Sequence, residues 1–107
     1  VLDFMQQTLG GEYELIIANN GKDAYNLFVK ERPILIIADV YMPQKDGLDL
    51  IKEVRGISEV PIIVESGGNV GNLQKYFEFH RVFHILEKPF TQELLLETVK
   101  KALAPTV

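Results

Sequence analysis

The chain has 107 residues, a net charge of −4 and no cysteine, and 47% of its residues are apolar. This length holds one domain with one hydrophobic core, and the composition is that of an ordinary globular protein. The acidic balance, without any basic cluster, argues against direct binding of nucleic acid, and the lack of cysteine excludes disulfides and thiolate metal sites. No apolar stretch approaches the roughly 20 residues of a membrane span. A cytoplasmic protein without a membrane partner is therefore expected.

Helical and strand-like patterns alternate along the chain. In chain order, the apolar spacing predicts a helix over 1–9, a strand over 13–18, a helix over 22–31, a strand over 34–39, a helix over 46–55, a strand over 61–66, a helix over 70–77, a strand over 82–86 and a last helix capped by Thr91. Such alternation favours a parallel sheet with right-handed crossovers and helices on both faces. The predicted fold class is α/β, a doubly wound parallel sheet, in a single domain over 1–107.

The strand over 34–39 ends in a candidate functional residue. The sequence Ile34-Leu35-Ile36-Ile37 is an unbroken apolar run, which is typical of a strand buried on both faces. Asp39 follows at the carboxyl end, where open parallel sheets place their ligand chemistry. An aspartate at a strand end can also have a purely structural role, in which its carboxylate accepts a hydrogen bond from a backbone N–H of the following loop. Asp39 alone therefore does not decide the function.

Two further strand ends carry polar side chains. Ser66 ends the third predicted strand, and Gly67 after it leaves room for an anion and a backbone N–H to meet it. Lys88 ends the fourth, where its ammonium can neutralise a carboxylate or phosphate; a cis bond to Pro89 would point it inward. Taken singly, Ser-Gly-Gly is mostly a loop and most lysines are solvated. Together with Asp39, they supply the nucleophile, hydroxyl and cation that an aspartyl phosphate needs.

A family resemblance rests on these residues. The pattern Asp-x-x-Met-Pro-x-x-Asp-Gly beginning at Asp39, then Ser66, then Lys-Pro-Phe beginning at Lys88, resembles the receiver domains of two-component response regulators. The resemblance covers essentially the whole chain and implies a flavodoxin-like fold with strand order 2-1-3-4-5. It also implies that Asp39 is the phosphoacceptor, that Lys88 and Ser66 clamp the phosphoryl group, and that Gly67 belongs to the phosphate loop.

The same resemblance implies partners and a cofactor. A sensor histidine kinase would phosphorylate Asp39, and the new charge would draw the Ser66 loop inward and change affinity for a second copy or an effector domain. Mg²⁺ would be held by the Asp39 carboxylate, the Tyr41 backbone carbonyl and an acidic pair. The chemistry is limited to self-phosphorylation and autodephosphorylation, so the chain is not expected to be an enzyme.

The chain departs from the family pattern in two places. It begins inside what would be the first helix, so the first strand and its acidic pair are absent, and four of the usual five strands remain. Asp3 is the only acid near the start and belongs to a predicted helix, so no metal role is assigned to it. We therefore expect this N-terminally truncated receiver domain to bind Mg²⁺ weakly. Near Lys88, Ile85 stands where the family often has a switching Tyr or Phe.

The absent strand would be the central one, so its loss leaves the strand over 13–18 without a neighbour. Two arrangements would restore pairing. The strand over 13–18 can move beside the strand over 34–39, giving four strands, or a segment from a second copy can fill the gap.

The sequence also leaves alternatives to the receiver function. A degenerate receiver that binds proteins without taking phosphate is the main alternative, supported by the missing acidic pair. A small hydrolase or nucleotide enzyme is disfavoured because the chain has neither a Gly-x-Ser-x-Gly elbow nor a P-loop. His80 and His84 have a helical metal spacing, but the predicted helix ends between them. The aromatic residues from Tyr76 to Phe83 are interpreted mainly as packing, with a partner-binding face as the alternative.

Overall fold

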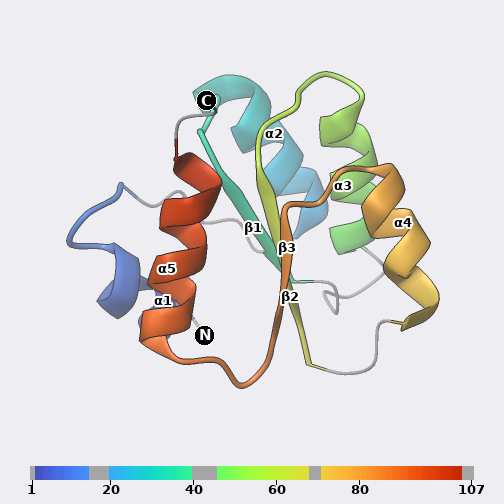
Figure 1. Cartoon of the computed structure of the whole chain (residues 1–107). Coiled ribbons are helices and arrows are strands. Elements are labelled where there is room, and N and C mark those ends of the chain that lie inside the picture. Colours follow the sequence, from blue (N-terminus) through green and yellow to red (C-terminus); the bar gives the residue numbers. More distant parts are fainter. Residues whose placement is uncertain (1, 15–19, 40–45, 68–70, 105–107) are drawn as a thin grey trace.

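The computed structural model describes residues 2–14, 20–39, 46–67 and 71–104. Its elements, in chain order, are α1 (Leu2–Leu9), α2 (Gly21–Glu31), β1 (Ile36–Asp39), α3 (Asp46–Arg55), β2 (Ile62–Ser66), the 3-10 helix η2 (Gly71–Leu73), α4 (Gln74–Phe79), β3 (His84–Glu87) and α5 (Gln92–Leu103). Strands and helices alternate from β1 onward, as the apolar spacing predicts. The predicted α/β class with a parallel sheet is therefore confirmed (Figure 1).

The described sheet has three strands in the order β1-β2-β3, and both pairings are parallel. β2 is central, and all five of its residues are buried. In register, Asp39 of β1 lies opposite Glu65 of β2, and Ser66 of β2 lies opposite Glu87 of β3. The three strands therefore end together, and their carboxyl ends form one edge of the sheet.

Helices cover both faces of this sheet, with α1 and α5 on one face and α2, α3 and α4 on the other (Figure 1). The face under α2, α3 and α4 buries a set that includes Phe28, Val54, Ile62, Val64 and Phe77. The opposite face buries Leu9, Ile63, Leu86, Leu95 and Val99. Successive residues of β2 alternate between these two cores, which is the period of two that a strand requires.

The strand predicted over 13–18 is not among the described strands. Tyr13 and Glu14 are not in a strand, and residues 15–18 lie outside the described part of the chain. The predicted four-strand sheet is thus seen as three strands within the described residues.

Three boundaries differ from the prediction, each for a local reason. β1 begins at Ile36, whose backbone N–H donates to the Pro61 carbonyl oxygen, whereas Ile34 is exposed. β3 begins at His84 because the Val82 N–H is still bonded to the Phe77 carbonyl oxygen that closes α4. The predicted helix over 70–77 is seen as η2 followed by α4, whose N-cap makes no side-chain hydrogen bond.

Arg55, at the end of α3, forms hydrogen bonds to two loops whose proximity could not be predicted from the sequence. Its guanidinium donates to the carbonyl oxygens of His80 at 2.6 Å, Val60 at 2.7 Å, Arg81 at 3.1 Å and Ser58 at 3.2 Å. These bonds join the loop that leads into β2 to the turn between α4 and β3. A fork of donors in one plane is a property of arginine that lysine lacks.

We expect Arg55→Lys to lower the free energy of unfolding by about 2 kcal/mol, because the partly buried carbonyl oxygens of Ser58, Val60 and His80 lose their donor. Urea melts of the wild type and the variant measure the loss. Arg81→Lys is the matched control: Arg81 forms an exposed ion pair with Glu59, and such pairs contribute about 1 kcal/mol or less. Equal losses in the two variants would contradict a structural role specific to Arg55.

Candidate functional site

The site lies at the edge of the sheet where the three strands end. Lys88 directly follows β3, and its Nζ donates to the Asp39 Oδ2 at 2.6 Å. The side chains of Lys88 and Asp39 are 30% and 29% exposed, so the pair is partly shielded but open to solvent on one side. An exposed ion pair in water contributes little, while partial burial strengthens the attraction between the charges. The structure therefore brings together two of the predicted site residues.

The backbone holds Lys88 in this place. Its N–H donates to the Ser66 carbonyl oxygen at 2.7 Å, so the parallel pairing of β2 and β3 continues one residue beyond β3. The Lys88–Pro89 peptide bond is cis, as considered from the sequence. The lysine side chain then spans the end of the central strand and reaches Asp39 at the end of β1.

Ser66 and Gly67 end β2 beside this ion pair. Ser66 is only 1% exposed, so its hydroxyl lies within the fold rather than on the open side of the site. Gly67 is exposed, and a Cβ built on it would come no nearer than 3.9 Å to the Lys88 Cδ, an ordinary contact. Tyr41, the remaining predicted site residue, lies outside the described residues.

Glu65 is a member of the site that the sequence reasoning missed. It is the only buried carboxylate among the described residues, 5% exposed, and lies directly opposite Asp39 in the sheet register. Burial raises the pKa of its carboxyl group; Lys88 lowers that pKa and Asp39 raises it. The sequence did offer a signal, because Glu65 directly follows the apolar run Ile62–Val64 within the same predicted strand. Acids are rarely buried unless they are paired, so an acid at such a position points to a special role.

Tyr76 links α4 to α3. Its hydroxyl donates to the Leu48 carbonyl oxygen of α3 at 2.6 Å, and its ring contacts the His80 ring.

The aromatic residues that were predicted mainly as packing differ in their exposure. Phe77 is buried in the core, whereas Phe79 and Phe83 are 76% and 46% exposed. A partner-binding role for those two residues stays a prediction.

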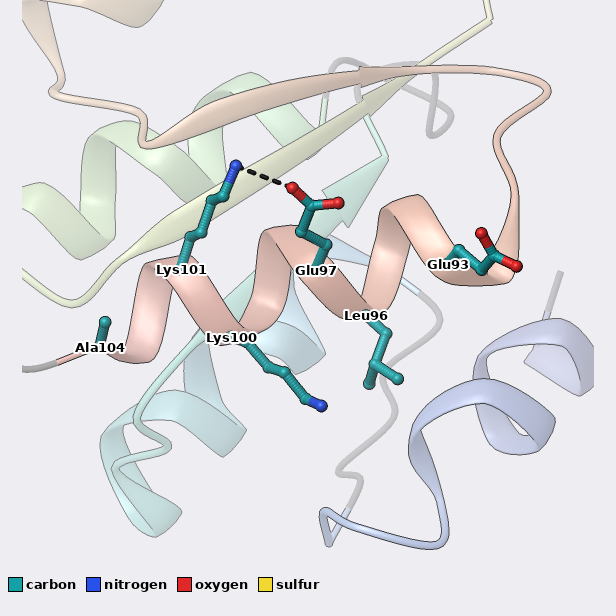
Figure 2. Close-up of a pocket in the computed structure, with 6 residues that line it drawn as sticks. All are labelled: Glu93, Leu96, Glu97, Lys100, Lys101 and Ala104. Atoms are coloured by element: carbon teal, nitrogen blue, oxygen red, sulfur yellow. Dashed lines mark ion pairs between the residues drawn. The ribbon is translucent and has the colours of Figure 1, made fainter.

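A pocket on α5 is separate from this edge. It is lined by Glu93, Leu96, Glu97, Lys100, Lys101 and Ala104 (Figure 2). Lys101 and Glu97 pair across one helical turn at 2.9 Å, an exposed i,i+4 ion pair. None of the predicted site residues lines this pocket.

Among the described helices, none is both long and apolar enough to cross a membrane.

The donors for Mg²⁺ can be tested residue by residue. Asp39 is the one expected ligand that the structure describes, and its Oδ2 is bonded to Lys88. Within the described ranges, no group of three or more His, Cys, Asp or Glu residues could hold a metal ion. Mg²⁺ needs several oxygen ligands and keeps its water shell around a lone carboxylate. The described residues therefore do not fit a magnesium site by themselves.

Comparisons with known proteins agree with this geometry. The family model described as "Response regulator receiver domain" matches residues 1–100. Sporulation initiation phosphotransferase F of Bacillus subtilis is 32% identical over 93 residues, which cover 85% of this chain and 74% of that protein. The chemotaxis protein CheY4 of Vibrio cholerae has a solved structure with a TM-score of 0.86 and 30% identity, covering 94% of this chain and 88% of that one.

Other relatives are much longer than the chain. The transcriptional regulatory protein YesN of Bacillus subtilis is 36% identical over 88 residues, which are 81% of this chain but only 24% of that protein. The similarity to such regulators thus concerns one part of their length.

The first prediction from this site concerns Mg²⁺. We expect the 107-residue chain to bind Mg²⁺ with a dissociation constant above about 1 mM, because one carboxylate cannot replace enough of its water shell. Isothermal titration calorimetry measures this affinity, with Asp39→Asn as the control for whatever weak binding occurs. Sub-millimolar binding would contradict the prediction and would mean that further oxygen ligands complete the site.

A second prediction concerns the buried acid. Because burial raises the pKa of Glu65, the folded chain holds this proton more tightly than the unfolded chain, and stability falls as the pH rises toward the folded pKa. We expect Glu65→Gln to be more stable than the wild type at pH 8 and to lose this advantage toward pH 4. Urea midpoints at both pH values measure it. The control is Glu87→Gln, which removes the charge of an exposed residue of β3. A Glu65→Gln variant that is less stable than the wild type at pH 8 would refute the prediction.

Proposed function

The chain belongs to the family of response regulator receiver domains, and from that premise we propose that it is a phosphoacceptor module of two-component signalling. Asp39 takes a phosphoryl group from a sensor histidine kinase, and residues 1–107 act as one receiver unit. The observation that carries this proposal is the 2.6 Å contact between the Lys88 ammonium and the Asp39 carboxylate at the carboxyl edge of the sheet. It places a cation, which can stabilise the negative charge of the transferred group, beside the proposed nucleophile.

The transfer itself needs few groups. An Asp39 oxygen attacks the phosphorus of the phosphohistidine, and the new O–P bond forms as the N–P bond breaks. The imidazole leaves with the electron pair of the broken bond. Lys88 already touches the Asp39 carboxylate, so its flexible side chain needs only a small movement to follow the phosphoryl oxygens as their negative charge grows.

The response to phosphorylation is proposed to pass through Ser66 and α4. Ser66 is 1% exposed, so its hydroxyl has to turn toward the open side of the site to reach a phosphoryl oxygen, and α4 follows Ser66 in the chain. The Tyr76–Leu48 hydrogen bond would then be strained or broken, because it ties α4 to α3. The face formed by α4, β3 and α5 would change its affinity for an effector domain or a second copy.

A phosphorylation-independent interaction domain is the second candidate. It is favoured by the incomplete donor set for Mg²⁺ among the described residues and by the exposed rings of Phe79 and Phe83. The two candidates differ in one property: only the first requires the Asp39 carboxylate to be chemically modified.

We expect the chain, extended at its start by the strand and acidic pair that the family pattern places there, to gain one phosphoryl group on incubation with acetyl phosphate and Mg²⁺. Intact-mass spectrometry measures the gain. Asp39→Asn should abolish it, while Asp49→Asn, an exposed acid of α3, should leave it unchanged. Equal phosphorylation of wild type and Asp39→Asn would mean that another residue is the acceptor, whereas no gain of mass in the wild type would favour the interaction-domain candidate.

We also expect Lys88→Ala to lower the phosphorylated fraction at least tenfold while costing about 1 kcal/mol of stability or less, because the pair is partly exposed. Mass spectrometry and urea melts on the same preparations separate the two effects. Lys101→Ala, which removes an exposed ion pair on α5, is the matched control. A large loss of stability in Lys88→Ala would show that this lysine is mainly structural.

A further inference from the structure

Glu65 lies on the same side of the sheet as the Asp39–Lys88 pair. Residues directly opposite one another in neighbouring strands project to the same face, and Glu65 is opposite Asp39 on one side and Leu86 on the other. Lys88 follows Leu86 by two residues, so the period of two returns it to that face. The acid therefore belongs to the central strand, with the strand that ends in Asp39 on one side and the strand that leads to Lys88 on the other.

The fold gives Glu65 little compensation for being charged. It is 5% exposed, and no hydrogen bond or ion pair of its carboxylate lies within the described part of the chain, where Lys88 bonds to Asp39 instead. Burial of a charged carboxylate is costly unless other groups pair with it. An apolar side chain would continue the Ile62–Val64 run. Packing therefore does not require an acid at this position.

The charge of Glu65 matters for an incoming anion. Asp39 and Lys88 cancel one another, so an ionised Glu65 leaves the three groups with one net negative charge. A phosphoryl group brings up to about two more. In a partly shielded site, like charges within a few ångströms repel one another more strongly than they do in water.

We propose that Glu65 sets the anion affinity of this site: when ionised, its carboxylate is a negative charge that weakens capture and retention of a phosphoryl group at Asp39. The inference rests on the proposed function for its biological meaning, since a weakened site shortens the phosphorylated state. Glu65 makes no bond to the phosphoryl group and acts only through its charge. It is thus a residue that tunes the site rather than a catalytic residue.

The test measures a non-covalent anion, so it does not depend on phosphorylation. Inorganic phosphate is titrated into the 107-residue chain at pH 8, and the amide signals of Gly67 and Lys88 are followed by NMR. Glu65→Gln and Glu65→Met both remove the charge, but only the first keeps a polar group. We expect both to bind phosphate about five- to tenfold more tightly than the wild type.

Two controls locate the effect. Glu87→Gln removes a charge from an exposed residue at the end of β3 and should leave the affinity unchanged, while Lys88→Ala should abolish the shifts. Equal affinity in wild type and both Glu65 variants, a gain in Glu65→Gln alone, or no shift in any protein would overturn the inference. Phosphorylation of Asp39 is judged separately by mass spectrometry, so tighter phosphate binding without phosphorylation would contradict the proposed function and leave the role of Glu65 supported.

Discussion

The ion pair between Asp39 and Lys88 depends on parallel strand register more than on either side chain. Asp39 ends β1, Lys88 follows β3, and their 2.6 Å contact spans the end of the central strand. The contact forms because the three strands end within one residue of one another and because the Lys88 N–H is bonded to the Ser66 carbonyl oxygen. A shift of one residue in either pairing would turn one of the two side chains to the other face.

The central strand carries both the stability and the electrostatics of this edge. Its residues Ile62–Val64 belong to the two cores, whereas Glu65 and Ser66 add a carboxylate and a hydroxyl at positions that are also buried. Burial of an acid opposes folding while it also shapes the field at Asp39. Stability and anion affinity are thus linked at one residue, as is common where a fold supports a functional site.

The strand ends could be predicted because apolar runs mark strands and a parallel sheet aligns their carboxyl ends; this placed Asp39, Ser66 and Lys88 at one edge. Contacts between distant loops could not. Arg55 binds backbone carbonyl oxygens, which every residue possesses, so no sequence pattern announces its partners. Glu65 was missed because it continues a buried run in which only apolar residues were expected. The later start of β3 could not be predicted either, because it depends on the bond from the Val82 N–H to the Phe77 carbonyl oxygen, beside Arg81 with its left-handed φ of 57°.

The central claim is that Asp39 is the residue that carries the phosphoryl group, with Lys88 beside it. Borohydride reduction after phosphorylation tests this most directly, because it converts an aspartyl phosphate to homoserine at the modified position and leaves free carboxylates intact. The account predicts homoserine at position 39, found by peptide mass spectrometry after transfer from a phosphorylated histidine kinase domain. Homoserine at another aspartate, or an unmodified Asp39 in a protein that has taken up phosphate, would contradict it.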